Sequence, residues 1–156
     1  MNRAMHILVI CSGNTCRSPL AAAMLSSRLA AEPALQHHTV SSAGTSAWDG
    51  SPASEGSYLV ALERDLDLST HRARMLTTDQ IQRADLILTM TAAHASRVAD
   101  LGGASKVATL SEYAGLDQGD VSDPYGGDVE AYRSAADIMA VLIEAIVARL
   151  RLESAR

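Results

Sequence analysis

The sequence predicts an α/β fold, a doubly wound four-stranded parallel sheet with helices on both faces. Short apolar runs alternate with helical patterns along the chain, which is typical of parallel strands joined by crossover helices. The 156 residues fit a single domain over residues 1–156 and leave no room for a second. Since 47% of the residues are hydrophobic but only 3% are aromatic, we expect an aliphatic core.

The apolar runs and turn residues place each element along the chain. Strands are expected at 6–10, 38–42, 85–90 and 106–110. Helices are expected at about 17–31, 53–65, 77–83, 92–101 and 128–152, with loops that collect Gly, Ser, Asp and Pro at 44–52 and 111–127.

Two further patterns concern the helices. Thr77 and Thr91 suit helix N-caps, and Pro52 stands close to the start of the second helix. The last helix carries an apolar stripe that we expect to pack on the sheet, formed by Tyr132, Ala135, Met139, Leu142, Ile143, Ile146 and Leu150.

Charge and composition exclude several function classes. A net charge of −5 without a Lys/Arg run argues against binding to nucleic acid or an anionic membrane. There is no apolar stretch near 18 residues and no signal-peptide pattern, so a cytoplasmic location is expected. Two cysteines with His37-His38 do not give zinc-ligand spacing, so we expect neither a metal nor another cofactor.

The most informative segment is residues 11–19, Cys-Ser-Gly-Asn-Thr-Cys-Arg-Ser-Pro, between an apolar strand and a helix-forming run. The N–H groups of such a loop and the positive end of the helix dipole suit a phosphate-like dianion. Arg17 can offer two parallel N–H donors to that dianion. Because these positive surroundings favour a thiolate, Cys11 is the candidate nucleophile of phosphoryl transfer through a phosphocysteine. Taken alone, Cys11 would instead be a small buried apolar residue.

This arrangement resembles the low-molecular-weight protein-tyrosine-phosphatase family, whose motif is Cys, five residues, Arg, then Ser or Thr. The resemblance covers nearly the whole chain, through segments at 41–45, 69–74, 84–90 and 123–127. It implies a metal-independent phosphoprotein phosphatase that acts on a phosphorylated protein partner. It also implies a phosphate cradle made by Ser12, Gly13, Asn14, Thr15, Cys16 and Arg17.

The resemblance assigns roles to residues around this loop. The hydroxyl of Ser18 is expected to donate to the Cys11 thiolate and to help it leave, while Ser42 and His71 hold Asn14. Gly13 permits a positive φ, and Asn14 also tolerates the left-handed region.

Asp123 is the candidate general acid. By resemblance it protonates the leaving atom and then activates water. Asp120 and Asp128 flank it as rival carboxylates, and an Asp-Pro pair is also a common turn. Asp123 is preferred because the Asp-Pro-aromatic pattern of the family falls on residues 123–125.

The resemblance also suggests a substrate pocket, with Trp48 as one wall and Tyr125 opposite. Tyrosine-directed members often carry two adjacent aromatics after Asp-Pro, whereas Gly126 follows Tyr125 here. Thr15 stands where that branch commonly has an aliphatic isoleucine, and the loop looks like that of the protein-arginine-phosphatase branch. The sequence therefore slightly favours phosphoarginine, with phosphotyrosine as the alternative substrate.

Three further interpretations concern this loop. Cys16 is close enough in sequence to form a disulfide with an oxidised Cys11, or it only packs in the loop. Related arsenate reductases use the same loop but need more cysteines downstream, and none follows Cys16. A catalytically silent phosphate-binding module usually lacks the nucleophile, arginine or acid, all of which are present. The oligomeric state is left open.

Overall fold

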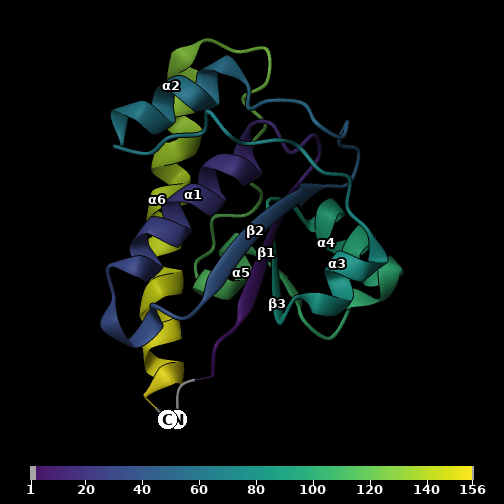
Figure 1. Cartoon of the computed structure of the whole chain (residues 1–156), viewed down its shortest axis with the longest axis vertical. Coiled ribbons are helices and arrows are strands. Elements are labelled where there is room, and N and C mark those ends of the chain that lie inside the picture. Colours follow the sequence, from purple (N-terminus) through teal and green to yellow (C-terminus); the bar gives the residue numbers. More distant parts are fainter. Residues whose placement is uncertain (1–2, 156) are drawn as a thin grey trace.

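The computed structural model describes residues 3–155 and contains one parallel sheet with strand order β2-β1-β3-β4 (Figure 1). The strands are β1 (His6–Cys11), β2 (Thr39–Gly44), β3 (Leu86–Thr89) and β4 (Val107–Thr109). Ile7 pairs with Val40 on one side and with Leu86 on the other, so β1 is an inner strand. Since the chain runs from β1 to β2 and then returns to β3 on the other side of β1, the strand order reverses at β1. In doubly wound sheets ligands bind at this point, beyond the carboxyl ends of the strands.

Helices cover both faces of the sheet. They are α1 (Arg17–Ala30), α2 (Glu55–Glu63), α3 (Thr78–Arg83), α4 (Ala92–Val98), α5 (Leu110–Ala114) and α6 (Val129–Ser154), with short turns η1 (Pro33–Leu35) and η2 (Ala99–Gly103). Alternate residues of β1 face opposite layers. Ile7 and Val9 belong to the core under α1 and α6, whereas Leu8 and Ile10 belong to the core with α3 and α4. The predicted fold class is confirmed.

The predicted elements are present with shifted ends, and two short ones, η1 and α5, were not predicted. The expected loop 111–127 contains most of α5, and the helix expected at 92–101 ends in the π-helical turn η2. Thr109 and Glu112 form a capping box at the start of α5, a pattern that the sequence carries. The predicted caps Thr77 and Thr91 do accept hydrogen bonds from the first turns of α3 and α4.

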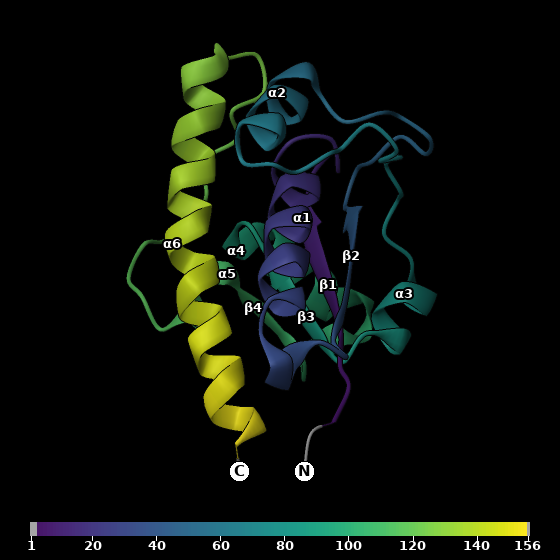
Figure 2. The same ribbon diagram turned by 60° about the vertical axis from the view of Figure 1, so that its left-hand side comes forward.

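The apolar stripe of α6 is fully buried and shares one core with residues of β1 and β3. The backbone of α6 lies nearest to α1, α5 and α2. Figure 2 shows α1 between α6 and strand β2. This 26-residue helix therefore lies beside α1. Within residues 3–155, none of the helices combines the length and apolarity needed to cross a bilayer.

Candidate active site

The predicted phosphate loop follows the carboxyl end of β1 and leads into α1. Cys11 is the last residue of β1 and Arg17 the first of α1. A cavity of about 280 Å³ opens at this loop. Its lining residues are Cys11, Ser12, Gly13, Thr15, Cys16, Arg17, Ser46, Asp123 and Tyr125. Nearly all the predicted cradle residues thus face one space with the candidate acid.

Cys11 lies almost fully buried at the base of this cavity. Its Sγ is 2.9 Å from the Oγ of Ser18, which belongs to the first turn of α1. The thiol therefore stands at the positive end of the α1 dipole, where anions bind favourably. A hydroxyl within hydrogen-bond distance can donate to a thiolate at this position.

Arg17 is buried, and its donors are only partly used. Its Nη1 donates to the carbonyl of Val121 at 2.7 Å, and its Nη2 lies 3.6 Å from Oδ2 of Asp123. Its Nε is the one buried side-chain nitrogen or oxygen without a hydrogen-bond partner in the described part of the chain. Because an unsatisfied buried donor on a cation is costly, this group is suited to receive an anionic ligand.

Asn14 shapes the loop from behind. It adopts a φ of 56°, and its Nδ2 donates to Ser18 at 2.7 Å and to Ser42 at 2.9 Å. Its Oδ1 accepts from the backbone N–H of Arg74 at 2.9 Å, and His71 Nε2 donates to its carbonyl at 2.7 Å. The structure thus brings Ser42 and His71 to Asn14. Gly13 does not have a positive φ, so its predicted conformational role falls to Asn14 alone.

Three carboxylates near the site lie in different surroundings. Asp120 accepts a hydrogen bond from the N–H of Ala92 at the start of α4, and Asp128 caps α6. Asp123, with its side chain 49% exposed, is the only one of the three that lines the cavity. It also accepts from the N–H of Tyr125 at 3.1 Å, which holds the Asp-Pro turn.

Only one of the two predicted aromatic walls lines the cavity. Tyr125 lines the cavity and is 75% exposed, whereas Trp48 is 83% exposed and does not line it. Ser46 takes a place in the wall because its N–H donates to the carbonyl of Ser12 at 3.0 Å. That hydrogen bond holds the loop after β2 against the phosphate loop and leaves Trp48 beyond it.

Cys16 is buried; it lines the cavity, and its thiol contacts the N-cap residue of α2 and a residue of α6. Its thiol lies 3.3 Å from the hydroxyl of Ser54 and 3.6 Å from that of Tyr132. Burial and the neighbouring Cys16 raise the pKa of Tyr132. Both cysteines are free thiols. The partners of Cys16 come from the second and last helical segments, which the local motif could not reveal.

His94 is a neighbour of the site that sequence reasoning missed. It is buried, with Nε2 2.8 Å from the hydroxyl of Ser12 and Nδ1 2.9 Å from that of Thr91. Burial and the charge of Arg17 lower its pKa, while Asp120 and Asp123 act in the opposite direction. Its position in the sequence could have indicated this place near the site. His94 follows the carboxyl end of β3, which lies at the same edge of the sheet as Cys11.

Comparison with known proteins gives this geometry a family. The model for "Low molecular weight phosphotyrosine protein phosphatase" matches residues 6–156. The chain belongs to this family. The phosphatase is 36% identical over 150 residues to a protein-arginine-phosphatase from Geobacillus stearothermophilus, covering 95% of this chain and 97% of that one.

Other relatives of the phosphatase carry a different activity in their names. A probable low molecular weight protein-tyrosine-phosphatase, EpsP, from Ralstonia nicotianae is 36% identical over 145 residues, which are 93% of this chain and 95% of EpsP.

Among solved structures, the YwlE arginine phosphatase from Geobacillus stearothermophilus superposes with a TM-score of 0.87 at 35% identity, covering 96% of this chain and 94% of that one. The phosphatase is thus a cysteine-dependent enzyme of this family.

Proposed function

We propose that this phosphatase removes phosphate from protein side chains through a phosphocysteine at Cys11, with no metal or other cofactor. The observation that carries the proposal is the buried, unpartnered Nε of Arg17 in the same cavity as the Cys11 thiol. A guanidinium edge held there recognises two oxygens of a phosphoryl group. The positive end of α1 adds to this attraction.

In the first step the Cys11 thiolate attacks phosphorus opposite the leaving atom. A phosphorus–sulfur bond forms while the phosphorus–oxygen or phosphorus–nitrogen bond breaks. Asp123 transfers its proton to the departing atom, so that a neutral alcohol or guanidine leaves. Arg17 and the N–H groups of the loop stabilise the charge on the transferring phosphoryl oxygens.

In the second step water attacks the phosphocysteine. Asp123, now a carboxylate, takes a proton from that water, and the phosphorus–sulfur bond breaks to release inorganic phosphate. The hydroxyl of Ser18, 2.9 Å from the sulfur, donates to the thiolate as it departs. Asn14 contacts the same hydroxyl at 2.7 Å and fixes its position.

We favour phosphoarginine over phosphotyrosine as the substrate, by a small margin. Thr15 places a hydroxyl in the cavity wall, where the tyrosine-directed branch commonly has an aliphatic residue. A hydroxyl suits a planar, hydrogen-bonding guanidinium better than an apolar ring. A single aromatic, Tyr125, lines the cavity, which leaves little apolar surface to hold a phenyl group. Two relatives named as protein-arginine-phosphatases support the same choice.

The decisive experiment compares phosphoarginine and phosphotyrosine peptides of the same sequence on wild type and on Thr15→Ile. We expect wild type to prefer phosphoarginine in kcat/KM, and Thr15→Ile to shift the preference toward phosphotyrosine by ~1–3 kcal/mol. A wild-type preference for phosphotyrosine that Thr15→Ile leaves unchanged would refute the arginine assignment. Turnover of para-nitrophenyl phosphate in EDTA, abolished in Cys11→Ser, is the control for the mechanism itself.

The cellular partner in this proposal is a phosphorylated protein in the cytoplasm. The free thiols of Cys11 and Cys16 fit a reducing compartment. Neither nucleic acid nor a membrane is needed as a partner, because the anion-binding groups act on one phosphoryl group in a local cavity.

A further inference from the structure

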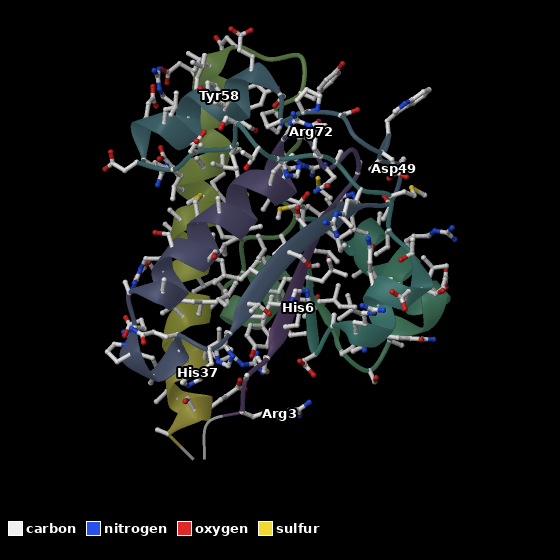
Figure 3. The ribbon with its side chains drawn as sticks, in the orientation of Figure 1. Arg3, His6, His37, Asp49, Tyr58 and Arg72 are labelled. Carbon is white, nitrogen blue, oxygen red and sulfur yellow. The ribbon has the colours of Figure 1, made fainter. Side chains whose placement is uncertain are left out.

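A second hollow, here named the β2 groove, lies between α1 and the edge strand β2. Its volume is about 310 Å³, and it shares no lining residue with the catalytic cavity. An apolar side is formed by Pro19, Ala22, Ala23 and Val40. The polar side consists of Ser26, Ser41, Ser42, His71, Arg72 and Arg74. Figure 3 shows Arg72 close to the first turn of α1. No carboxylate lines the groove.

The charge of the β2 groove is uncompensated. Arg72 and Arg74 are exposed, and neither forms an ion pair with any residue between 3 and 155. Burial lowers the pKa of His71, the hydrogen bond to the Asn14 carbonyl acts in the opposite direction, and the positive charges of Arg72 and Arg74 lower the pKa further. Like charges gathered without an acid repel one another unless an anion joins them. The whole chain has a net charge of −5, so the positive cluster of Arg72 and Arg74 is a local feature of this groove.

We propose that the β2 groove is a second anion-binding site, which takes the phosphate group of a small organic phosphate. Guanidinium groups bind phosphate oxygens through paired N–H donors, and the hydroxyl of Ser26 can add a further hydrogen bond. The hydroxyl of Ser41 is already within 2.7 Å of Nε2 of His6. The apolar body of the ligand would lie against Ala22, Ala23 and Val40. The groove volume is in the range of small-molecule sites and too small for a folded partner.

The β2 groove adjoins the phosphate loop through Asn14. Three of its residues hold this asparagine: Ser42 through its hydroxyl, His71 through its imidazole and Arg74 through its backbone N–H. An anion bound in the groove therefore contacts residues that fix the left-handed conformation of Asn14. Binding and catalysis are coupled through this residue, a consequence that rests on the proposed function.

The binding experiment uses amide NMR on full-length Cys11→Ala protein, titrated with the non-hydrolysable phenylphosphonate and, separately, with inorganic phosphate. We expect the amides of Ala23 and Ser41 to shift with a Kd of their own, distinct from that of Gly13 and Thr15 in the catalytic loop. Phenylphosphonate should bind the groove at least threefold more tightly than phosphate, because its ring covers the apolar side. Equal affinities would refute the organic ligand in favour of free phosphate.

The matched variants test the charge. Arg72→Gln/Arg74→Gln should raise the groove Kd at least tenfold and leave the shifts of Gly13 and Thr15 intact. The control Arg83→Gln/Arg97→Gln removes two exposed arginines outside the groove, which gives the same net charge, and should not change the groove Kd. Absent shifts at Ala23 and Ser41, or a groove Kd unaffected by the first pair of changes, would overturn the site.

A kinetic arm separates the coupling from the proposed function. With para-nitrophenyl phosphate, phenylphosphonate should raise KM by competing at Cys11 and should also change kcat at least twofold. That kcat effect should persist in the Arg83→Gln/Arg97→Gln enzyme and vanish in Arg72→Gln/Arg74→Gln. Groove binding with an unchanged kcat would overturn the coupling. A wild-type chain that binds in the groove but has no turnover at all would overturn the proposed function instead.

Discussion

At the scale of single residues, the structure separates groups of like chemistry by their surroundings. Asp120, Asp123 and Asp128 all lie in the loop before α6, yet Asp120 and Asp128 hold helix N-termini and only Asp123 of the three lines the cavity. The two cysteines differ in the same way, since Cys11 contacts Ser18 whereas Cys16 contacts Ser54 and Tyr132. Each difference leads to a test.

Replacing the candidate acid should impair catalysis in a way that depends on the leaving group. We expect Asp123→Asn to lower kcat by roughly 10²–10⁴ with leaving groups that need protonation, and less with para-nitrophenolate. The control Asp120→Asn changes a neighbouring carboxylate that serves as a helix partner and should lose far less. Rates across a series of aryl phosphates measure the effect. An equal loss for every leaving group would contradict the acid role.

Mild peroxide should join the two cysteines of the loop. Oxidation of Cys11 by H₂O₂ gives a sulfenic acid and water, and attack by the Cys16 thiol then forms the disulfide and releases a second water. The Cys16 side chain must first leave Ser54 and Tyr132. Mass spectrometry should show one intramolecular linkage, with activity restored by thiol. Sulfinic acid at Cys11 in protein with an intact Cys16 thiol would disprove the protection of Cys11 by Cys16. The control is Cys16→Ser, which should lose its activity irreversibly.

At the scale of elements, the site depends on how closely β2 approaches the loop that follows β1. Gly44 ends β2, and its backbone N–H donates to Arg74 at 2.9 Å. A Cβ on Gly44 would lie 2.2 Å from the carbonyl oxygen of Ser12 and 3.0 Å from the nitrogen of Asn14. The neighbouring atoms belong to the backbone of the loop, so relief requires movement of the phosphate cradle itself.

Gly44→Ala should therefore damage both stability and turnover. We expect a loss of about 1–3 kcal/mol in the free energy of unfolding, as for other overpacked sites, together with a lower kcat. Gly115→Ala is the control, because a φ of 70° strains the backbone there while no atom lies within 4 Å of the added Cβ. That variant should lose about 1 kcal/mol and keep its kcat. Urea unfolding and para-nitrophenyl phosphate turnover measure the two effects, and normal behaviour of Gly44→Ala would contradict the close approach.

At the scale of the whole molecule, the buried His94 and the half-buried His38 and His71 join separate segments and make stability depend on pH. His38 accepts a hydrogen bond from the N–H of Met5, just before β1, while His71 contacts the phosphate loop and His94 contacts that loop from the opposite layer. Burial lowers the pKa of all three. Since the folded-state pKa lies below the unfolded value of about 6.5, the folded state binds fewer protons in that window.

Stability should therefore be complete above about pH 6.5 and decline as the pH falls through the folded pKa values. Urea unfolding at intervals between pH 7.5 and 5 measures this decline. His71→Gln/His94→Gln should show a shallower slope over the same range, even though its stability at pH 7.5 is lower. A wild-type stability that rises on acidification, or equal slopes for the two proteins, would contradict the assignment.

The sequence by itself determined the fold class and the strand–loop–helix that holds Cys11, Arg17 and Ser18, whereas Asp123 was preferred through the resemblance to the family. These features depend on residues that are adjacent in the sequence, because helix caps, apolar periodicity and a phosphate loop are local properties. The capping box of α5 was equally local and could have been read.

Only the tertiary structure decided which distant residues surround that loop. His94 reaches Ser12 from α4, the carbonyl of Val121 holds Arg17, and Ser46 rather than Trp48 completes the cavity wall. The packing of α6 on α1 and the unpaired arginines of the β2 groove likewise depend on how the layers meet. Such contacts join residues far apart in the chain, and their partners are chosen by crossover geometry and packing, which no local pattern records.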